Sequence, residues 1–261
     1  MNEGVLQKVK SFLNILQDGS ITAKLSSGIG LELALVFVGA SDPAAIEKLS
    51  IVGEIKRSDL KYIRKKMANT LKVLDLSKTI FENDRLPNKA FDKCYALTSI
   101  ILPNTLIEIR QKTFSFCTAL TSVKFPDSVV MIGDLAFYRC TSLTSITIPD
   151  SVVEICFRAF AECSGLSSIT IPDSVAKIES GAFGNCTGLT TVNFPETEVE
   201  IGNYAFFNCS GLTSVNIPKE VIKIGEAAFG DCPPVITVHP DNPVYYSEEG
   251  KLKLKINNQD V

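Results

Sequence analysis

The stretch that decides the fold runs from Leu143 to Cys163 and reads LTSITIPDSVVEICFRAFAEC. At a distance of 23 residues, Leu166 to Cys186 reads LSSITIPDSVAKIESGAFGNC, with proline, phenylalanine and cysteine at the same places. The period holds without insertion for the phenylalanines Phe91, Phe114, Phe137, Phe160, Phe183, Phe206 and Phe229, and for the cysteines Cys94, Cys117, Cys140, Cys163, Cys186, Cys209 and Cys232. A fixed period of about 20 to 50 residues is typical of stacked repeat proteins. The sequence therefore predicts a solenoid.

Each repeat has four predicted parts. In residues 143–148, apolar and polar residues alternate, as in a strand with one buried face. Pro149 ends the strand, because proline cannot donate to a central ladder, and Asp150 and Ser151 favour a turn. Residues 152–155 return to the core, and the spacing within residues 159–166 predicts one face of a short helical turn. Such a unit can bury its apolar face only against its neighbours.

The motif L-T-S-I-T-I-P-D-S-V, followed by I-x-x-x-A-F-x-x-C, resembles the BspA-like (treponemal-type) leucine-rich repeat family. The resemblance covers roughly Leu71 to Lys253. It implies an α/β leucine-rich repeat solenoid that is right-handed and curved, with a parallel β-sheet on the concave face and short helical turns on the other side. It also implies a bacterial or protist surface protein that works by binding and adhesion.

The pattern outside the perfect repeats predicts a cap at each end. We assign residues 1–45 to an N-terminal cap, 46–89 to a degenerate leucine-rich repeat, 90–232 to the regular 23-residue repeats and 233–261 to a C-terminal cap. An end cap is expected because the terminal repeats of a solenoid otherwise expose a sheet edge and an apolar face.

In the N-terminal part, apolar spacing predicts a helix over residues 5–16, and residues 21–38 read as one or two strands. The apolar run 29–40 is interpreted as a buried strand. A second helix is predicted from an N-cap at Ser58 to Met67, and its lysines and arginines make this region basic. Two interpretations of this basic face are open. It is a helix face exposed to solvent, or it binds an anionic partner.

In the C-terminal part, Val235–Val238 reads as the last strand of the stack, and residues 239–246 as a loop. Residues 251–256 alternate lysine with apolar residues. This pattern predicts an edge strand whose lysines face outward, which blunts an open edge.

Composition excludes several classes of function. The 261 residues carry a formal net charge of -3, so nothing draws the chain as a whole to nucleic acid or to an anionic membrane. No apolar run is as long as a membrane span. Residues 1–16 lack the apolar core and cleavage site of a signal peptide, which leaves two readings: the protein is not exported by that route, or a signal has been removed.

Seven of the eight cysteines share one inward register, so we expect them to be buried, unpaired thiols. Disulfide pairing among some of them, as in many secreted chains, is the alternative. These seven residues are here called the cysteine ladder. No metal site is expected, because the cysteine ladder contains neither a C-x-x-C spacing nor a histidine. The eighth, Cys156, shares its column with Arg110, Gly133, Glu179, Gly202 and Gly225. Because arginine and glutamate are accepted there, Cys156 is predicted to be the one exposed thiol.

Function in a solenoid lies in columns of outward residues. The candidate partner-binding column on the concave sheet consists of Lys124, Thr147, Thr170, Asn193 and Asn216, here called the strand strip. These side chains are short and mostly polar, without the aromatic and arginine anchors usual at hot spots. They fit either a plain soluble sheet face or a broad, low-relief binding surface. The acidic turn column Asp127, Asp150, Asp173 and Glu196 is interpreted as local turns rather than as a cation site. At Glu198, where other repeats have valine, a local shift should turn Val199 inward.

No motif of a hydrolase, metalloprotease, nucleotide-binding loop or dinucleotide fold is present in the sequence. We therefore expect no catalytic residues and no cofactor. The resemblance implies a non-enzymatic binding protein, at a cell surface or secreted, with a protein or glycan partner, and we expect it to be a monomer. The alternative is an intracellular scaffold for protein–protein interaction, and a third possibility is an enzyme in residues 1–70.

Overall fold

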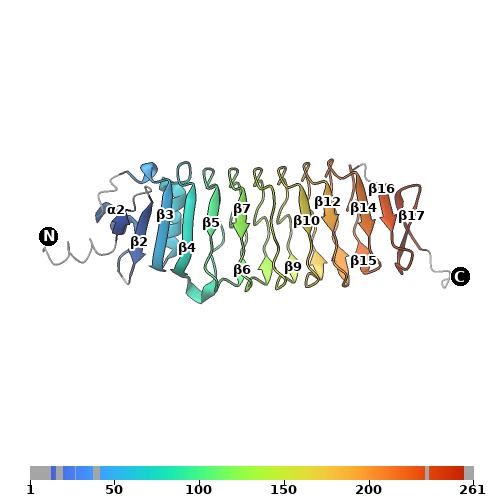
Figure 1. Ribbon diagram of the computed structural model, residues 1–261, viewed down its shortest axis with the longest axis horizontal. Coiled ribbons are helices and arrows are strands. Elements are labelled where there is room, and N and C mark those ends of the chain that lie inside the picture. Colours follow the sequence, from blue (N-terminus) through green and yellow to red (C-terminus); the bar gives the residue numbers. More distant parts are fainter. Residues whose placement is uncertain (1–12, 16–19, 27, 38–41, 233–234, 256–261) are drawn as a thin grey trace.

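The computed structural model describes residues 13–15, 20–26, 28–37, 42–232 and 235–255. They form a parallel-sheet β-solenoid of about eight turns, which confirms the predicted fold with its 23-residue repeats. Figure 1 shows the turns side by side in one elongated row, with β2 near one end of the row and β17 at the other. The division into caps, degenerate repeat and regular repeats stays a prediction.

The first strands of the repeats build the first sheet, except at residues 143–149, to which no strand is assigned. Its six-stranded part has the order β1-β2-β3-β4-β5-β7, and the pairs β10–β12 and β14–β16 follow further along the stack. Within this first sheet, every strand pairing is parallel except that of β1 with β2. The strands are β1 (Leu13–Ile15), β2 (Ile21–Leu25), β3 (Lys48–Glu54), β4 (Val73–Ile80), β5 (Ser99–Ile101), β7 (Ser122–Lys124), β10 (Ser168–Thr170), β12 (Thr191–Asn193), β14 (Ser214–Ile217) and β16 (Val235–Val238).

The short apolar return of each repeat forms a second parallel sheet, which the sequence analysis did not predict. Its order is β15-β13-β11-β9-β8-β6. The strands are β6 (Glu108–Ile109), β8 (Met131–Ile132), β9 (Glu154–Ile155), β11 (Lys177–Ile178), β13 (Val199–Ile201) and β15 (Val221–Ile224). In each strand of the second sheet the pattern is the same: an isoleucine faces the core, and the residue before it reaches the surface or lies half-buried. The exception to strict register is β13, where a shift at Val199 and Glu200 buries Val199 and leaves Glu198 exposed, as predicted.

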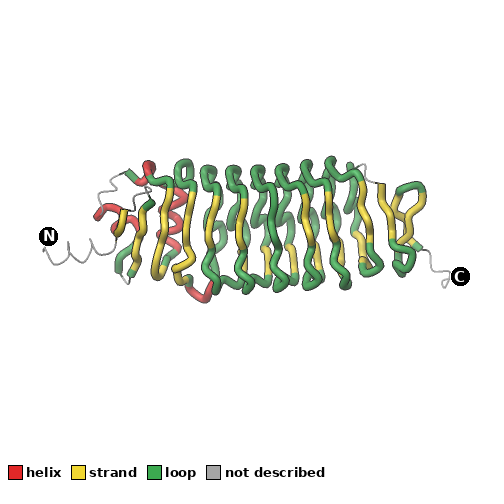
Figure 2. The backbone as a smooth tube through the Cα atoms, viewed as in Figure 1, coloured by secondary structure: helices red, strands yellow, loops and turns green. Residues whose placement is uncertain are grey.

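The predicted helical turns are hydrogen-bonded turns rather than helices. Within a repeat, N–H groups bond three residues back, as from Cys163 to the Phe160 carbonyl at 3.3 Å. Between repeats, the Phe160 N–H donates to the Ala182 carbonyl at 2.7 Å and Glu162 N–H to the Gly184 carbonyl at 2.8 Å. The described helices all precede residue 86, as Figure 2 shows: α2 (Leu31–Phe37), α3 (Arg57–Lys66) and the 3₁₀ turns η1 (Pro43–Ala45) and η2 (Glu82–Asp84).

The core is organised around one stack of phenylalanine rings. Six consecutive pairs, from Phe91 to Phe229, have ring centroids 5.1–5.5 Å apart, with interplanar angles between 3° and 24°. Except for Phe229 at the C-terminal end, these rings are fully buried. The spacing follows the repeat-to-repeat distance of a parallel sheet, about 4.8 Å. Each repeat therefore places its ring directly on the ring of the previous one.

The cysteine ladder satisfies the backbone beside this stack. From Cys117 onward, each ladder thiol donates to the carbonyl of the phenylalanine 26 residues earlier, at 2.9–3.2 Å. All eight cysteines are free thiols, which confirms the unpaired ladder. Cys232 is only half-buried, because no further unit of the same form covers the last repeat. Hydrogen bonding from Cys209 lowers the pKa of Cys232.

Cys156 is a correction to the sequence analysis, which made it the exposed thiol. Its exposed fraction is 7%, and burial raises its pKa to about 12. Long side chains such as Arg110 reach solvent from this column with their heads, while their stems stay covered. A cysteine is too short to do so, and it ends beneath its neighbours.

The N-terminal end differs from the predicted elements. The run 29–40, predicted as a strand, contains helix α2, in which Leu31, Ala34 and Leu35 are buried. That spacing of i, i+3 and i+4 is helical. The helix predicted over residues 5–16 lies mainly outside the described residues, and its part at Leu13–Ile15 is strand β1.

Helix α3 begins one residue before the predicted cap. Lys56, not Ser58, is its N-cap residue. The buried Asp59 accepts from the Lys56 N–H and from the Leu31 N–H, at 2.8 Å each. One carboxylate thus satisfies the N-terminal turns of both α2 and α3, and ties the two helices together.

The C-terminal end closes with strands β17 (Tyr245–Glu248) and β18 (Lys251–Leu254), which form an antiparallel hairpin. Strand β18 covers residues 251–254 of the predicted edge strand, and β17 pairs with it. Residues 239–246 were expected to be loop throughout, but β17 begins at Tyr245. The fully buried Asn242 holds this cap. Its amide donates to the Pro218 and Val221 carbonyls, at 2.9 and 3.0 Å, and its oxygen accepts two backbone N–H groups.

We predict that Phe160→Ala lowers the free energy of unfolding by about 3–5 kcal/mol, because it removes a fully buried ring from the middle of the stack. Chemical denaturation measures the change. Phe157→Ala, three residues away and 40% exposed, is the matched control and should cost far less. Equal losses in the two variants would contradict the ring stack.

We predict that Cys232 is the most reactive thiol of the native protein, and that Cys156 reacts no faster than the buried ladder. The reasons are the half-burial and lowered pKa of Cys232 and the raised pKa of Cys156. Iodoacetamide labelling at pH 8, followed by peptide mass spectrometry, should mark one or two sites before unfolding and all eight after it. Rapid labelling of Cys156 would be the opposite result.

Candidate functional site

Four residues of the strand strip lie on strands of the first sheet, and Thr147 lies between β7 and β10 in a segment to which no strand is assigned. Lys124, Thr147, Thr170, Asn193 and Asn216 are all exposed and come from successive repeats. In the paired strands, Ile101 lies opposite Lys124, and Thr170 opposite Asn193. Ile101, which is 50% exposed, extends the same column toward the N-terminal end. The paired strands thus place Thr170 beside Asn193, and the 23-residue period relates the other strip residues to them.

The chemistry of the strip is that of a flat polar surface. The Asn193 amide donates to the Thr170 hydroxyl at 3.1 Å, and Thr237 on β16 donates to Asn216 at 3.3 Å. Among the described residues, Lys124 has no ion-pair partner within 4.0 Å. These neighbour contacts orient side chains along the row, while each side chain keeps polar atoms in solvent.

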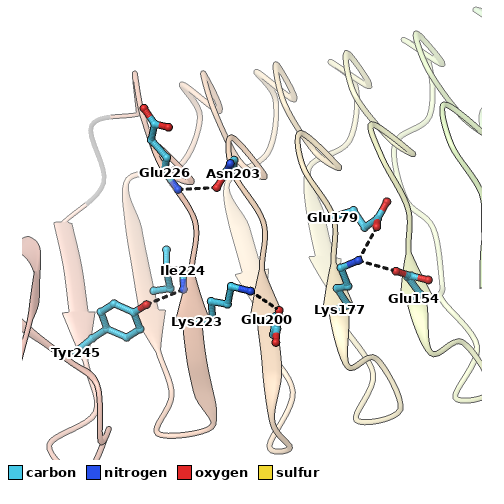
Figure 3. A network of polar contacts seen from close by, with 9 residues as sticks. All are labelled: Glu154, Lys177, Glu179, Glu200, Asn203, Lys223, Ile224, Glu226 and Tyr245. Carbon is cyan, nitrogen blue, oxygen red and sulfur yellow. Dashed lines mark hydrogen bonds and ion pairs between the residues drawn. The ribbon is translucent and has the colours of Figure 1, made fainter.

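The second sheet carries an ionic row that the sequence analysis missed. Figure 3 shows Lys177 on β11 between Glu154 and Glu179, with nitrogen–oxygen distances of 3.1 and 2.6 Å. Lys223, two repeats beyond Lys177, contacts Glu200 of the repeat between them at 3.0 Å. The 23-residue column Glu154, Lys177, Glu200, Lys223 alternates in charge, and that alternation in the sequence was the available signal.

Charge pairing in this row changes the acidity of its members. Hydrogen bonds to Glu179 and Glu154 raise the pKa of Lys177, and the bond from Lys177 lowers the pKa of Glu179. The pairs are solvent-exposed to a large extent, so each contributes little to stability. Within the 23-residue column, the two glutamates and the two lysines balance in formal charge.

One group of possible metal ligands occurs in the described part of the chain. Asp134, Cys156 and Glu179 place one ligand atom each within 4.8 Å of one another. Both Glu179 oxygens are already engaged, one by Lys177 at 2.6 Å and the other by the Phe157 N–H at 2.8 Å. The Cys156 thiol, with its raised pKa, holds its proton at neutral pH. These contacts compete with metal binding.

Side chains of the acidic turn column and of the basic helix α3 form hydrogen bonds with nearby backbone groups. Asp173 accepts the Glu196 N–H of the next repeat at 2.8 Å, which links two turns. On α3, Arg64 donates to the Lys89 and Ala90 carbonyls at 2.7 and 3.0 Å. Arg64 thus docks the helix onto the first regular repeat.

We predict that Lys177→Met lowers stability at pH 7 by less than about 1 kcal/mol, and that the loss disappears in acid. Because the folded-state pKa of Glu179 is lowered, its stabilisation is present above its unfolded pKa and is lost as pH falls through the folded pKa. Denaturation of both proteins at pH 7 and at about pH 3, below the ordinary glutamate value of about 4.3, measures the difference.

Lys124→Met is the control for this experiment, because Lys124 has no ion-pair partner among the described residues. It should change stability equally little at both pH values. A stability difference between wild type and Lys177→Met that is the same at both pH values would contradict the pairing.

None of the helices in the described ranges is long and apolar enough to cross a membrane.

Comparison with known proteins identifies the family of this chain. The family model described as "BspA type Leucine rich repeat region" matches in six copies, over residues 84–198 and 153–251. A leucine rich cell surface protein from Faecalibacterium prausnitzii is 27% identical, with a TM-score of 0.58 over 94% of this chain. The present chain spans only 57% of that protein's resolved chain.

Two more solved structures are similar at lower scores. The Treponema pallidum leucine rich repeat protein is 23% identical, with a TM-score of 0.49, and the match covers 77% of this chain and 88% of that one. A Bacteroides ovatus leucine-rich repeat protein is 18% identical, with a TM-score of 0.42, over 85% of this chain and 79% of that one. No curated protein matches the sequence. Since the family model covers more than half of its residues, the chain belongs to the BspA-type leucine-rich repeat family.

Proposed function

We propose that the chain is a non-enzymatic binding protein that presents the strand strip to a protein or glycan partner at a cell surface. The observation that carries this proposal is the strip itself: five exposed polar side chains, one from each of five successive repeats. The buried ring stack behind the strip fixes their spacing. A long, flat and regular surface suits a macromolecule, because small ligands need a concave site.

The family supports a binding role. Leucine-rich repeat solenoids use extended surfaces of stacked repeats for recognition. The Faecalibacterium relative is described as a cell surface protein, and this supports the proposed location. Short side chains without aromatic anchors predict modest affinity per site, which many surface-attached copies would raise through avidity. We also propose that the chain is a monomer and binds no nucleic acid.

One observation favours a second candidate, an intracellular scaffold for protein–protein interaction. All eight cysteines are free thiols, and unpaired cysteines are usual in reducing compartments. The two candidates differ in compartment. Antibody labelling of intact and permeabilised cells that express the full-length native protein separates them: surface labelling supports adhesion, and labelling only after permeabilisation supports the scaffold.

We predict that the double substitution Thr147→Arg and Thr170→Arg weakens partner binding roughly tenfold or more, because two long cationic side chains break the flat strip. Surface plasmon resonance with immobilised fibronectin, laminin and collagen as probes measures binding. Both positions are exposed, so circular dichroism should show an unchanged fold.

The matched control is Val130→Arg with Val153→Arg, two exposed positions in consecutive repeats outside the strip. This variant should bind like wild type. If the strip variant binds a probe as tightly as wild type does, the strip is not the site.

A further inference from the structure

A hollow of about 410 Å³ opens on the turn segments of neighbouring repeats, and it contains no residue of the strand strip. Its lining includes Tyr138, Arg158, Glu162, Asn185, Tyr204 and Phe207. The volume is within the range of about 300–1,000 Å³ typical of small-ligand sites. The hollow is therefore large enough for a small ligand and lies apart from the proposed protein-binding face.

Two glycines in a single repeat create the hollow. Gly181 stands in the outward column that contains Arg158 and Tyr204, and Gly184 in the column that contains Tyr138 and Phe207. The backbone does not require glycine at residue 181, because Arg158 and Tyr204 adopt the same positive φ at the equivalent positions, 50° and 56° against 64°. The glycines thus leave out two neighbouring side chains. The Arg158 side chain extends over residue 181, where an added Cβ would lie 3.1 Å from Arg158 Cγ.

One uncompensated charge remains in the lining. Glu162 is neutralised, since its two oxygens accept from the Tyr138 hydroxyl and from Arg139 Nε, at 2.6 Å each. Arg158 stacks its guanidinium 5.2 Å from the Phe157 ring centroid and has no carboxylate within 4.0 Å among the described residues. An unpaired guanidinium presents a planar fork of donors that fits a carboxylate.

The other side chains suit a ligand with a C–H face and hydroxyl groups. Tyr204 is 42% exposed and packs edge-on against Phe207, with ring centroids 5.6 Å apart. The electron-rich face of such a ring attracts polarised C–H groups. Asn185 accepts from the Asn208 amide at 2.8 Å, which orients its own amide N–H groups for another acceptor.

We propose that this hollow binds an acidic saccharide. Arg158 holds the carboxylate, Tyr204 contacts the C–H face of a sugar ring, and Asn185 donates to a hydroxyl or carbonyl oxygen. A purely apolar ligand would leave Arg158 and Asn185 desolvated without partners, and that would cost affinity. A neutral sugar would contact Tyr204 and Asn185 but would leave the Arg158 guanidinium without an anionic partner.

The test uses isothermal titration calorimetry of the whole chain with 3′-sialyllactose and with lactose, which lacks the carboxylated sugar. We expect 3′-sialyllactose to bind roughly tenfold or more tightly than lactose. Arg158→Gln should abolish this preference. Gly184→Tyr should abolish binding altogether, because the ring fills the hollow as Tyr138 and Phe207 fill the same column elsewhere.

Matched controls lie in the same two columns but outside the hollow. Lys112→Gln removes a positive charge two repeats from Arg158, and Asp92→Tyr adds a ring four repeats from Gly184. Both should bind like wild type, and so should the strip variant Thr147→Arg with Thr170→Arg, so this test is independent of the proposed function. Arg158→Gln changes an exposed head group and serves as the decisive variant if Gly184→Tyr does not fold.

Four results would each overturn the proposal. They are equal binding of lactose, wild-type affinity in Arg158→Gln, competition by a triglutamate peptide at the same concentration as 3′-sialyllactose, and no binding at millimolar concentration of either 3′-sialyllactose or a hyaluronan tetrasaccharide.

Discussion

The structure depends on the identical register of its repeats. Flat phenylalanine rings stack at 5.1–5.5 Å only if every repeat advances by the same distance, close to the spacing of strands in a sheet. The ladder cysteines reinforce this register, because each thiol reaches back to a carbonyl of the preceding repeat. An insertion of one residue inside a repeat would displace a ring, a thiol and two strands together.

The same register turns the surface into columns. Each outward position of the repeat becomes a row of side chains about 5 Å apart, and the rows differ in chemistry. The first sheet presents the flat polar strip, and the second sheet presents a column of alternating charge. The turn segments carry the hollow that Gly181 and Gly184 help to line. A row can therefore change its surface chemistry at one repeat without any change to the core.

The sequence predicted the features that the period controls. The ring column, the unpaired thiols, the exposure of the strip and the inward shift of Val199 all follow from comparing equivalent positions. Features that depend on how far a side chain must extend to reach solvent were not predicted. Cys156 was judged by the long side chains in its column, although a short side chain at that place stays covered.

The ends of the chain were predicted less well, because they have no equivalent repeat for comparison. The run 29–40 is apolar enough for a strand or a helix, and contact with the Asp59 carboxylate fixes the start of α2. The second sheet was missed because its strands are only two to four residues long, too short for a clear alternation. The hollow could have been found, since Gly181 and Gly184 remove bulk from two outward columns in one repeat.

Amide hydrogen exchange of the full chain tests the central claim most directly, because it asks whether the turn segments are bonded from repeat to repeat. The N–H groups of Phe137, Phe160 and Phe183 donate to carbonyls of the next repeat at 2.7–2.8 Å. We predict that they exchange only through global unfolding, as slowly as the slowest strand amides, while the exposed turn residue Asp150 exchanges rapidly. Phenylalanine amides that exchange as fast as Asp150 would show that the turns are ordinary surface loops, and would contradict the register on which every column depends.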